Sequence, residues 1–498
     1  MATTVADLLA RAADRDPDGV AVVHAGARVT WSTLDARVTA FARGALARGL
    51  RRGDRIALIT ANRTELIVAH LGALRAGLIS VPINPVLTAH ELAQRTHDTS
   101  PELIICDASS EVAVREALMT NHIGTSGVVA VGSPAWGDLM RPDHPAVEPG
   151  CIDSEAVGVL MFTGGIGGRP QAVMLTHRAL MASVTQLASL EPAPLEPIDV
   201  LLLSLPLVHS QALGVLALAF FVGATVVLER RFDPEESFTM VEREGVTAVA
   251  GSPALFTDWS MREHAGEVLD DVRLMALGQA AMSPAVAAQL LTLTGLRVWE
   301  GYGMAESSGL LTCTGDRLSA EGNVGRPLPG VELRLVDVDG EDIDDDGDPG
   351  EIYVRSHALF SGLWPDGASA PDAQGWFATR DVAYLDEAGD LHLVDRRHDL
   401  IVVNGFPVYP HEVEVVIDSL DGVSESAVIG VEHPVTGHAV TALVVLDPDS
   451  TVTPDDVREQ CALRLARHKC PTIVEIVDSL PHTEFGIVQR HGLRSARD

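Results

Sequence analysis

The sequence predicts an α/β protein with a large N-terminal domain of layered sheets and helices and a small mobile α+β C-terminal domain. Apolar segments with helical periodicity alternate with short β-branched runs up to about residue 395. The last hundred residues follow a separate α+β pattern. A chain of 498 residues also exceeds the size at which one hydrophobic core keeps growing. We therefore expect two domains, residues 1–395 and 396–498.

The N-terminal part repeats a helix–strand alternation that is typical of layers around largely parallel sheets. Helices are expected at residues 34–48, at 65–76 and from 177 onward. Strands are expected at 55–59, 103–106, 128–131, 157–162 and 297–300. Two prolines in residues 79–85 predict a chain reversal after the second helix.

A run of acids and glycines, residues 339–350 (DGEDIDDDGDPG), marks a compositional break. It lacks the closing glutamate of an EF-hand loop, so a solvated hairpin turn is favoured over a calcium loop. Strands are then expected at 351–355, 382–385 and 391–394. In the C-terminal domain, helices are expected at 410–420 and 454–467, and strands at 423–430 and 440–446. Residues 395–399 would join the two domains.

Composition narrows the classes of partner and compartment. The formal net charge is −33, with 69 acidic and 36 basic residues, so the surface repels nucleic acid and anionic lipid. Five cysteines without metal-ligand spacing indicate reduced thiols, hence a cytoplasmic protein. Residues 1–13 lack the apolar region of a signal peptide. The most apolar stretch, 212–228, is shorter than the roughly 20 residues of a spanning helix, so no integral membrane segment is expected.

A glycine-dense loop, residues 163–170 (TGGIGGRP), separates a predicted strand from a predicted helix. Such a loop lets backbone N–H groups approach an anion closely, although glycine loops equally serve as plain turns. No Gly-Lys-Ser/Thr follows, which excludes a Walker A loop.

Further motifs follow in a fixed order along the chain. They are 301–306 (GYGMAE), 375–381 (GWFATRD), 395–399 (DRRHD), Gly405, 408–414 (VYPHEVE) and 481–486 (PHTEFG). In this order and spacing they resemble the signature series of the adenylate-forming superfamily, which includes acyl-CoA synthetases, luciferases and peptide-synthetase adenylation domains. The resemblance spans essentially the whole chain and is greatest to fatty-acid or medium-chain acyl-CoA ligases.

The resemblance implies a two-step reaction. A carboxylic acid attacks the α-phosphorus of ATP, with Mg²⁺ present, to give an acyl-adenylate and pyrophosphate. The C-terminal domain then rotates, and the thiol of CoA, or of an acyl-carrier protein, displaces AMP. The first step requires donors and cations that neutralise phosphate charge. The second requires a hinge.

The resemblance also assigns roles to positions of this sequence. Tyr302 would stack on adenine, Asp381 would accept the ribose hydroxyls, and Arg396 would reach ribose and phosphate. Glu306 matches a magnesium-associated catalytic carboxylate, and His209 matches a residue that flanks the substrate carboxylate. The implied cofactor-binding positions are Thr163, Gly165, Gly168, Gly278, Gln279, Ala280, Gly301, Tyr302, Ala305, Asp381, Arg396 and Gly405. A core aromatic at 302, a turn aspartate at 381 and a satisfied core histidine at 209 remain the alternatives.

The departures from the family pattern all fall on the phosphate site. In the glycine loop, hydroxyl donors are replaced by Gly164, Ile166 and Gly167. The two expected lysine positions are occupied by Gln171 and Ile487, and the threonine expected before Glu306 is Ala305. Every replacement removes a donor or a charge, so ATP and Mg²⁺ binding should be weakened. Arg169 offers a partial substitute cation.

Three functions fit these residues. The first is a carboxylic acid–CoA ligase with weak adenylation and an apolar acid as substrate. The second is a binding protein for acyl-AMP, acyl-CoA or a nucleotide. The third is an enzyme that keeps only the thioester-forming half-reaction, with a carboxylic acid or acyl-adenylate as small-molecule partner. The acyl group would be lined by Val208, His209, Ala212, Leu213, Gly278, Gly303 and residues 307–309.

Overall fold

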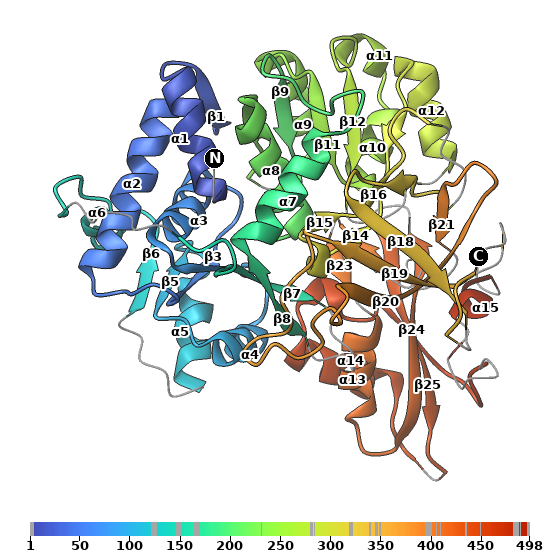
Figure 1. The fold of residues 1–498 in the computed structure, drawn as a ribbon. Helices are drawn as coiled ribbons and strands as arrows, with labels where there is room; N and C mark the ends of the chain where they lie inside the picture. Colours follow the sequence, from blue (N-terminus) through green and yellow to red (C-terminus); the bar gives the residue numbers. More distant parts are fainter. Residues whose placement is uncertain are drawn as a thin grey trace.

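The computed structural model describes most of the chain. The described residues are 4–120, 127–145, 152–163, 170–230, 232–278, 282, 284–317, 322–337, 340–343, 347, 350–393, 401–404, 406–408, 410–433, 436–448, 450–481, 488 and 490–495. They form a large mixed α/β domain followed by a smaller C-terminal domain, as expected (Figure 1).

Two largely parallel sheets form the N-terminal domain. The seven-stranded sheet has the order β13-β12-β11-β9-β10-β1-β2, and only β1–β2 is antiparallel. Its strands are β1 (Val20–His24), β2 (Ala27–Thr30), β9 (Val200–Leu203), β10 (Thr225–Leu228), β11 (Ala248–Gly251), β12 (Leu274–Leu277) and β13 (Val298–Trp299). These central strands are short continuous apolar runs, which is typical of a sheet covered on both faces.

The six-stranded sheet has the order β6-β5-β3-β4-β7-β8, with β7–β8 antiparallel. Its strands are β3 (Arg55–Ile59), β4 (Ile79–Pro82), β5 (Leu103–Cys106), β6 (Val128–Ala130), β7 (Val157–Thr163) and β8 (Gln171–Thr176). The predicted chain reversal at 79–85 is wrong at its start, because Ile79–Pro82 is a buried strand parallel to β3.

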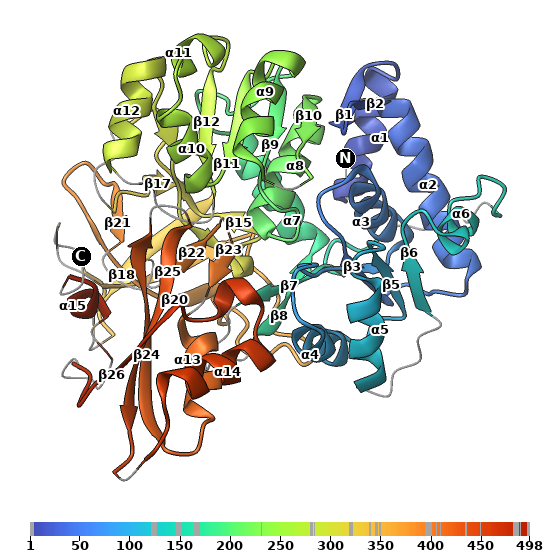
Figure 2. The same cartoon turned by 180° about the vertical axis from the view of Figure 1, so that it is seen from behind.

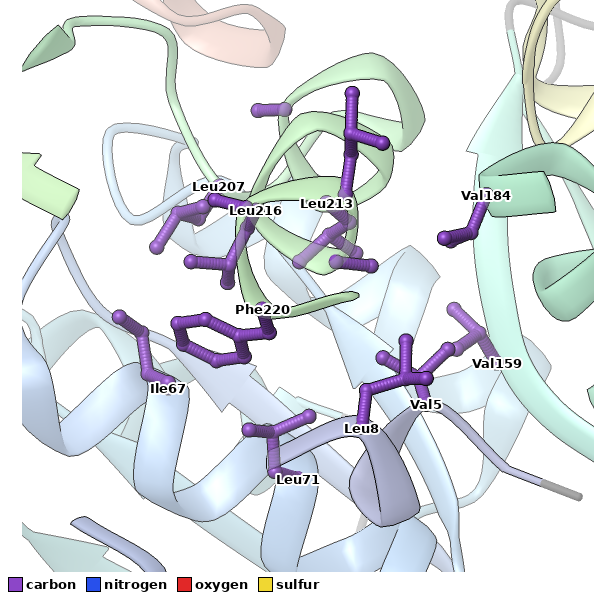
Figure 3. Close-up of a cluster of buried hydrophobic side chains, with 14 of the residues drawn as sticks. Val5, Leu8, Ile67, Leu71, Val159, Val184, Leu207, Leu213, Leu216 and Phe220 are labelled. Carbon is purple, nitrogen blue, oxygen red and sulfur yellow. The ribbon is translucent and has the colours of Figure 1, made fainter. Parts of the chain in front are cut away.

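The two sheets are joined by an apolar core between the helices that cover them. Figure 3 shows side chains from four helices and β7 meeting there. The helices are α1 (Val5–Arg15), α3 (Thr64–Ala76), α7 (His177–Ala188) and α8 (Ser210–Val222). Helix α8 and strand β10 together account for the apolar stretch 212–228. No helix among the described residues is both long and apolar enough to cross a bilayer.

The remaining helices of the N-terminal domain pack around the sheets or on neighbouring helices (Figures 1 and 2). They are α2 (Trp31–Ala47), α4 (Ala89–Thr99), α5 (Glu111–Thr120), α6 (Pro134–Leu139), α9 (Pro234–Glu244), α10 (Pro253–Ser260), α11 (Ala265–Val268) and α12 (Pro284–Thr294). Local sequence sets their ends. In α9, for example, Asp233 caps the first backbone amides and Gly245 ends the helix in a left-handed conformation.

Short strands and an antiparallel sheet complete this domain. The short elements are β14 (Gly303–Met304), the 3-10 turn η2 (Ala305–Ser307), β15 (Gly309–Leu310), β16 (Thr312–Cys313) and β17 (Arg326–Pro327). The sheet contains β18 (Val331–Val336), β19 (Gly350–Ser356), β20 (Trp376–Leu385) and β21 (Leu391–Leu393). Because Val336 pairs with Glu351, the acidic run connects two antiparallel strands, and the hairpin prediction is confirmed.

The C-terminal domain has its own sheet and its own apolar core. Its elements are β22 (Ile401–Val403), β23 (Phe406–Val408), α13 (Pro410–Asp418), β24 (Val423–His433), β25 (Gly437–Leu446), α14 (Pro454–Arg464), η4 (Arg467–Lys469), β26 (Ile473–Ile476) and α15 (Arg490–Ser495). The predicted helix 454–467 is too long, because Leu465 is extended. Figures 1 and 2 both place α13 and α14 beside α4.

Candidate functional site

The predicted phosphate loop connects two antiparallel neighbours, β7 and β8. Thr163, the last residue of β7, pairs directly with Gln171, the first residue of β8. Both are partly buried. The 3-10 turn η2 packs against both strands. The structure therefore brings Gln171 to the same neighbourhood as Ala305 and Glu306, although more than a hundred residues separate them in sequence.

A side-chain hydrogen bond joins Tyr302 to Asp381. The Tyr302 hydroxyl donates to Asp381 Oδ2 over 2.7 Å, while the Tyr302 backbone amide donates to Thr312 Oγ1 over 3.1 Å. Tyr302 is 6% exposed. Burial, and then the nearby carboxylate of Asp381, raise the pKa of Tyr302 well above its ordinary value. The phenol thus stays protonated at neutral pH and remains a donor to Asp381.

Two glycines beside Tyr302 are required by close backbone approach. A Cβ at Gly301 would lie 2.4 Å from the Thr312 carbonyl oxygen, and one at Gly303 would lie 2.0 Å from the Gly309 carbonyl oxygen. No side chain fits at these distances. These glycines therefore have a packing role, whatever ligand approaches them.

Glu306 lies in η2, which packs against β7, β8 and β15. Its backbone carbonyl accepts a hydrogen bond from Phe360 N over 2.8 Å, which fixes the turn. Among the described residues, no group of three or more His, Cys, Asp or Glu side chains could hold a metal ion. Glu306 alone would therefore hold Mg²⁺ only together with ligand phosphates and water, which is the usual way that ion is bound.

His209 precedes α8 as its N-cap residue. Its Nε2 atom is enclosed and has no hydrogen-bond partner in the described part of the chain. Burial lowers the pKa of His209 to about 4, so the imidazole is neutral at pH 7. Buried polar atoms in native proteins are almost always satisfied. An enclosed nitrogen without a protein partner is therefore available to a bound ligand or water.

An apolar cavity of about 60 Å³ lies next to Gly278. A Cβ at Gly278 would meet the Leu205 methyl carbons at 2.6 and 2.9 Å and Gln211 Oε1 at 3.2 Å, and both of these residues line the cavity. The lining side chains come from the end of α7, from α8 and from β9, β11, β12 and β13. They are Leu187, Leu190, Pro194, Leu195, Leu201, Leu205, Gln211, Val215, Leu218, Val249, Ala250, Leu274, Ala276, Leu277, Trp299, Glu300, Leu310 and Cys313.

The lining differs from the residues expected to hold an acyl group. Val208, His209, Ala212, Leu213, Gly278, Gly303 and residues 307–309 are not among the side chains that line this cavity. The cavity instead uses Gln211, Val215 and Leu218, which lie on another face of α8. Because α8 is apolar all round, its sequence has no amphipathic signal for the face that meets the sheet.

Several predicted site residues lie outside the described residues. They are Gly165, Gly168, Gln279, Ala280, Arg396, Gly405 and Ile487. Their roles stay predictions. So do those of Thr163, His209, Gly278, Gly301, Tyr302, Ala305, Glu306 and Asp381, for which the structure gives the position and not the role.

The mixed α/β architecture, with a large N-terminal domain and a smaller C-terminal domain, is that of the adenylate-forming enzymes. Family comparison agrees. The model for the AMP-binding enzyme family matches residues 9–364, and the model for its C-terminal domain matches residues 412–486. The chain therefore belongs to the AMP-binding enzyme family.

Relatives in this family are CoA ligases. The chain is 32% identical to a long-chain-fatty-acid–CoA ligase of Yersinia pestis, covering 99% of this chain and 94% of the relative. It is also 32% identical to a feruloyl-CoA synthase of an Amycolatopsis species, covering 97% of each. An acyl-CoA synthetase-like ligase is the function class that these relatives support.

Solved structures agree over almost the full length. The amide bond synthetase McbA of Marinactinospora thermotolerans superposes with a TM-score of 0.84 at 27% identity, covering 99% of each chain. The Bacillus subtilis o-succinylbenzoate CoA synthetase MenE, bound to a product analogue, gives a TM-score of 0.83 at 26% identity, covering 98% of each chain.

Proposed function

We propose that this protein is a carboxylic acid–CoA ligase-type enzyme in which adenylation is weak or lost and the thioester-forming half-reaction is retained. One observation carries the proposal. Gln171 and Ala305, which replace a lysine and a threonine of the family pattern, lie on elements that pack against each other. The two replaced positions therefore lie on neighbouring elements and are not scattered over the protein.

The expected loss in adenylation rate separates a slow ligase from an inactive one. Loss of one preorganised donor to developing charge typically costs about 10²–10³ in rate. Gln171 and Ala305 alone would then slow adenylation by roughly 10⁴–10⁶ if they acted independently, and coupling between neighbours reduces that figure. The third position, Ile487, removes a further cation.

The second half-reaction makes a smaller demand on phosphate donors. The CoA sulfur attacks the acyl carbonyl carbon, the bond from that carbon to the AMP phosphate oxygen breaks, and the thiol proton is released. AMP leaves as a stable anion. In this scheme Tyr302 and Asp381 hold the nucleoside, and His209 donates to the acyl oxygen as a neutral imidazole. ATP and Mg²⁺, where they bind, would supply only the preceding activation.

The acyl group would occupy the apolar cavity beside Gly278. The side chains that line this cavity are almost all apolar. This favours an apolar acid as the substrate. The thiol acceptor is CoA in this proposal, with the pantetheine of a carrier protein as the alternative outcome. We place the domain boundary between residues 395 and 396.

Turnover of a synthetic adenylate tests the proposal. The enzyme is given hexanoyl-AMP and CoA, and hexanoyl-CoA is measured by mass spectrometry. We expect enzyme-dependent product that falls at least about tenfold in Asp381→Ala, because a nucleoside hydrogen-bond partner is lost. Absence of enzyme-dependent product across a panel of acyl-adenylates and both thiol acceptors would overturn the proposal.

A binding protein without turnover is the second candidate. Replacement of phosphate-side residues alongside the buried Tyr302–Asp381 pair favours AMP-like ligands over ATP. Calorimetry with AMP, ATP and a nonhydrolysable acyl-adenylate separates the cases. Tight binding of the adenylate without product formation supports a binding protein, whereas equally weak binding of all three ligands contradicts both functions.

A further inference from the structure

A buried ion-pair cluster connects the two domains at the only lysine of the sequence. Lys469 is the single lysine among 36 basic residues, the others being arginines. It lies in η4 and is 5% exposed. A lysine is rarely buried to this degree unless it is paired. The one lysine of the sequence is therefore a buried residue whose partners must compensate its charge.

The partners of Lys469 come from both domains. Its Nζ donates to Glu91 Oε1 over 2.9 Å, and to Glu412 Oε1 and Oε2 over 2.9 and 3.0 Å. Glu91 is on α4 of the N-terminal domain, and Glu412 is on α13 of the C-terminal domain. All three side chains are less than 10% exposed. We call Glu91, Lys469 and Glu412 the interdomain triad.

The triad is built so that it can separate. Glu91 Oε2 accepts hydrogen bonds from both the backbone amide and the hydroxyl of Thr88, so Glu91 keeps two donors if Lys469 moves away. Burial disfavours ionisation of Glu91, but Lys469 and the Thr88 donors outweigh it and lower the pKa of Glu91. Lys469 would keep Glu412, which moves with it. Breaking the triad thus leaves no buried charge without a partner.

The turn that holds Lys469 also contacts the start of the C-terminal domain. The His468 ring packs on Phe406 with ring centroids 5.0 Å apart. Phe406 is in β23, just after the segment that joins the domains. Burial lowers the pKa of His468 to about 4, so this neighbour is neutral at pH 7 and does not repel Lys469. A movement of β22 and β23 would therefore be transmitted to η4.

We propose that Lys469 is a positioning residue that latches the C-terminal domain onto α4, and that the Lys469–Glu91 contact must open before the two domains can change their relative arrangement. The latch goes beyond the proposed function, because it concerns domain position and not the chemistry of the acyl group. Its tests therefore need no turnover.

The single lysine gives a direct measurement of latch opening. Reductive methylation with ¹³C-formaldehyde modifies Lys469 and the N-terminal amine, which NMR distinguishes. The matched control is Lys469→Arg combined with Arg458→Lys, which moves the only lysine to an exposed position on α14. We expect Lys469 to react at least about 10²-fold more slowly than the exposed control lysine, because a buried ion pair must open first.

Removal of the cross-domain partner should then release the lysine. Glu91→Gln keeps an acceptor for the Thr88 cap but removes the charge that faces Lys469. We expect methylation of Lys469 to accelerate by about tenfold or more, since a hydrogen bond between charged groups is lost. The unfolding midpoint of the C-terminal domain, followed by circular dichroism, should equal that of the native protein within experimental error. The apolar core of that domain does not contain Glu91.

A distance measurement reports the domain arrangement itself. Spin labels are attached through non-natural ketone residues at exposed Val112 on α5 and exposed Leu463 on α14. We expect one narrow distance in the native protein, a broadened or shifted one in Glu91→Gln and in Lys469→Met, and a largely retained one in Lys469→Arg. If Glu91→Gln changes neither the methylation rate nor this distance, the latch proposal is wrong. Both readouts remain informative even if no acyl-CoA is ever formed.

Discussion

Tyr302 is a buried aromatic residue that also makes a polar contact. Its ring is enclosed, its amide is held by Thr312, and its hydroxyl orients Asp381. The core-aromatic alternative and the adenine-stacking role both depend on this position. Packing and stacking both need only the ring, whereas the hydroxyl group orients Asp381, the expected partner of the ribose.

Tyr302→Phe should weaken AMP binding. The substitution keeps the ring and removes one donor to a carboxylate, a contact worth about 1.5–3 kcal/mol. We expect the Kd for AMP to rise about tenfold or more, measured by calorimetry. Tyr353→Phe on β19 is the matched control. Equal AMP affinities of the Tyr302→Phe variant and the native protein would show that the hydroxyl has no role in nucleotide binding.

Restoring three of the replaced side chains should recover part of the adenylation rate. We expect the triple variant Gln171→Lys, Ala305→Thr and Ile487→Lys to release acid-dependent pyrophosphate at least about 10²-fold faster than the native protein, because each change restores a donor to developing phosphate charge. Gln171→Met, Ala305→Val and Ile487→Met form the uncharged control. A native rate that already equals the restored rate would contradict the proposed loss.

At the scale of secondary-structure elements, the sequence predicts strand ends well where a β-branched run is the dominant local signal. Strands β3 and β5 end where their β-branched runs end, as expected. Proline is a common turn residue, but in the structure Pro82 is the last residue of β4. The β4–β7 ladder pairs Ser80 with Val159, so the missing N–H of Pro82 costs no ladder bond to β7.

Helices α3 and α7 bring two buried histidines together, which should make stability pH-dependent. Burial lowers the pKa of both His70 and His177 to about 4, and His70 also bonds to Ser80 Oγ over 2.8 Å. Between pH 4 and 6.5 the unfolded chain binds these protons and the folded chain does not, so stability rises with pH. Glu229, whose burial raises its pKa to about 7, acts in the opposite direction.

His70→Gln isolates the contribution of one histidine. The native protein should lose about 2 kcal/mol more than the variant between pH 7 and pH 5, because the variant has no proton to bind at this position. The free energy of unfolding in urea at the two pH values checks this. Identical losses in both proteins would mean that His70 titrates normally in the folded state.

Helix α8 forms one wall of the apolar cavity, and a larger side chain there should shorten the preferred acyl chain. We expect native activity to rise about fourfold for each added methylene until the cavity is full, which corresponds to about 0.8 kcal/mol per buried CH₂. Val215→Phe should move the optimum to shorter chains, and Val112→Phe on exposed α5 should not. An unchanged chain-length profile in Val215→Phe would place the acyl group elsewhere.

At the scale of the whole molecule, the sequence predicts the α/β fold class with a large domain followed by a smaller one, but it does not predict which distant segments meet. Alternating helices and strands predict the α/β domain, and the change of pattern near residue 395 predicts the second domain. No local rule connects Tyr302 to Asp381 or Glu91 to Lys469. Only the family resemblance brings Tyr302 and Asp381 to one predicted site. The Glu91–Lys469 contact follows from the arrangement of the two domains in space, which the sequence does not predict.

A ratio of two rates in one enzyme preparation tests the central claim most directly. Formation of hexanoyl-CoA is measured from hexanoyl-AMP plus CoA, and separately from hexanoate, ATP, Mg²⁺ and CoA. We predict that the first rate exceeds the second by at least about 10³, because only the second depends on the replaced phosphate donors. Equal rates from the two substrate mixtures would contradict the account and would indicate an ordinary acid–CoA ligase.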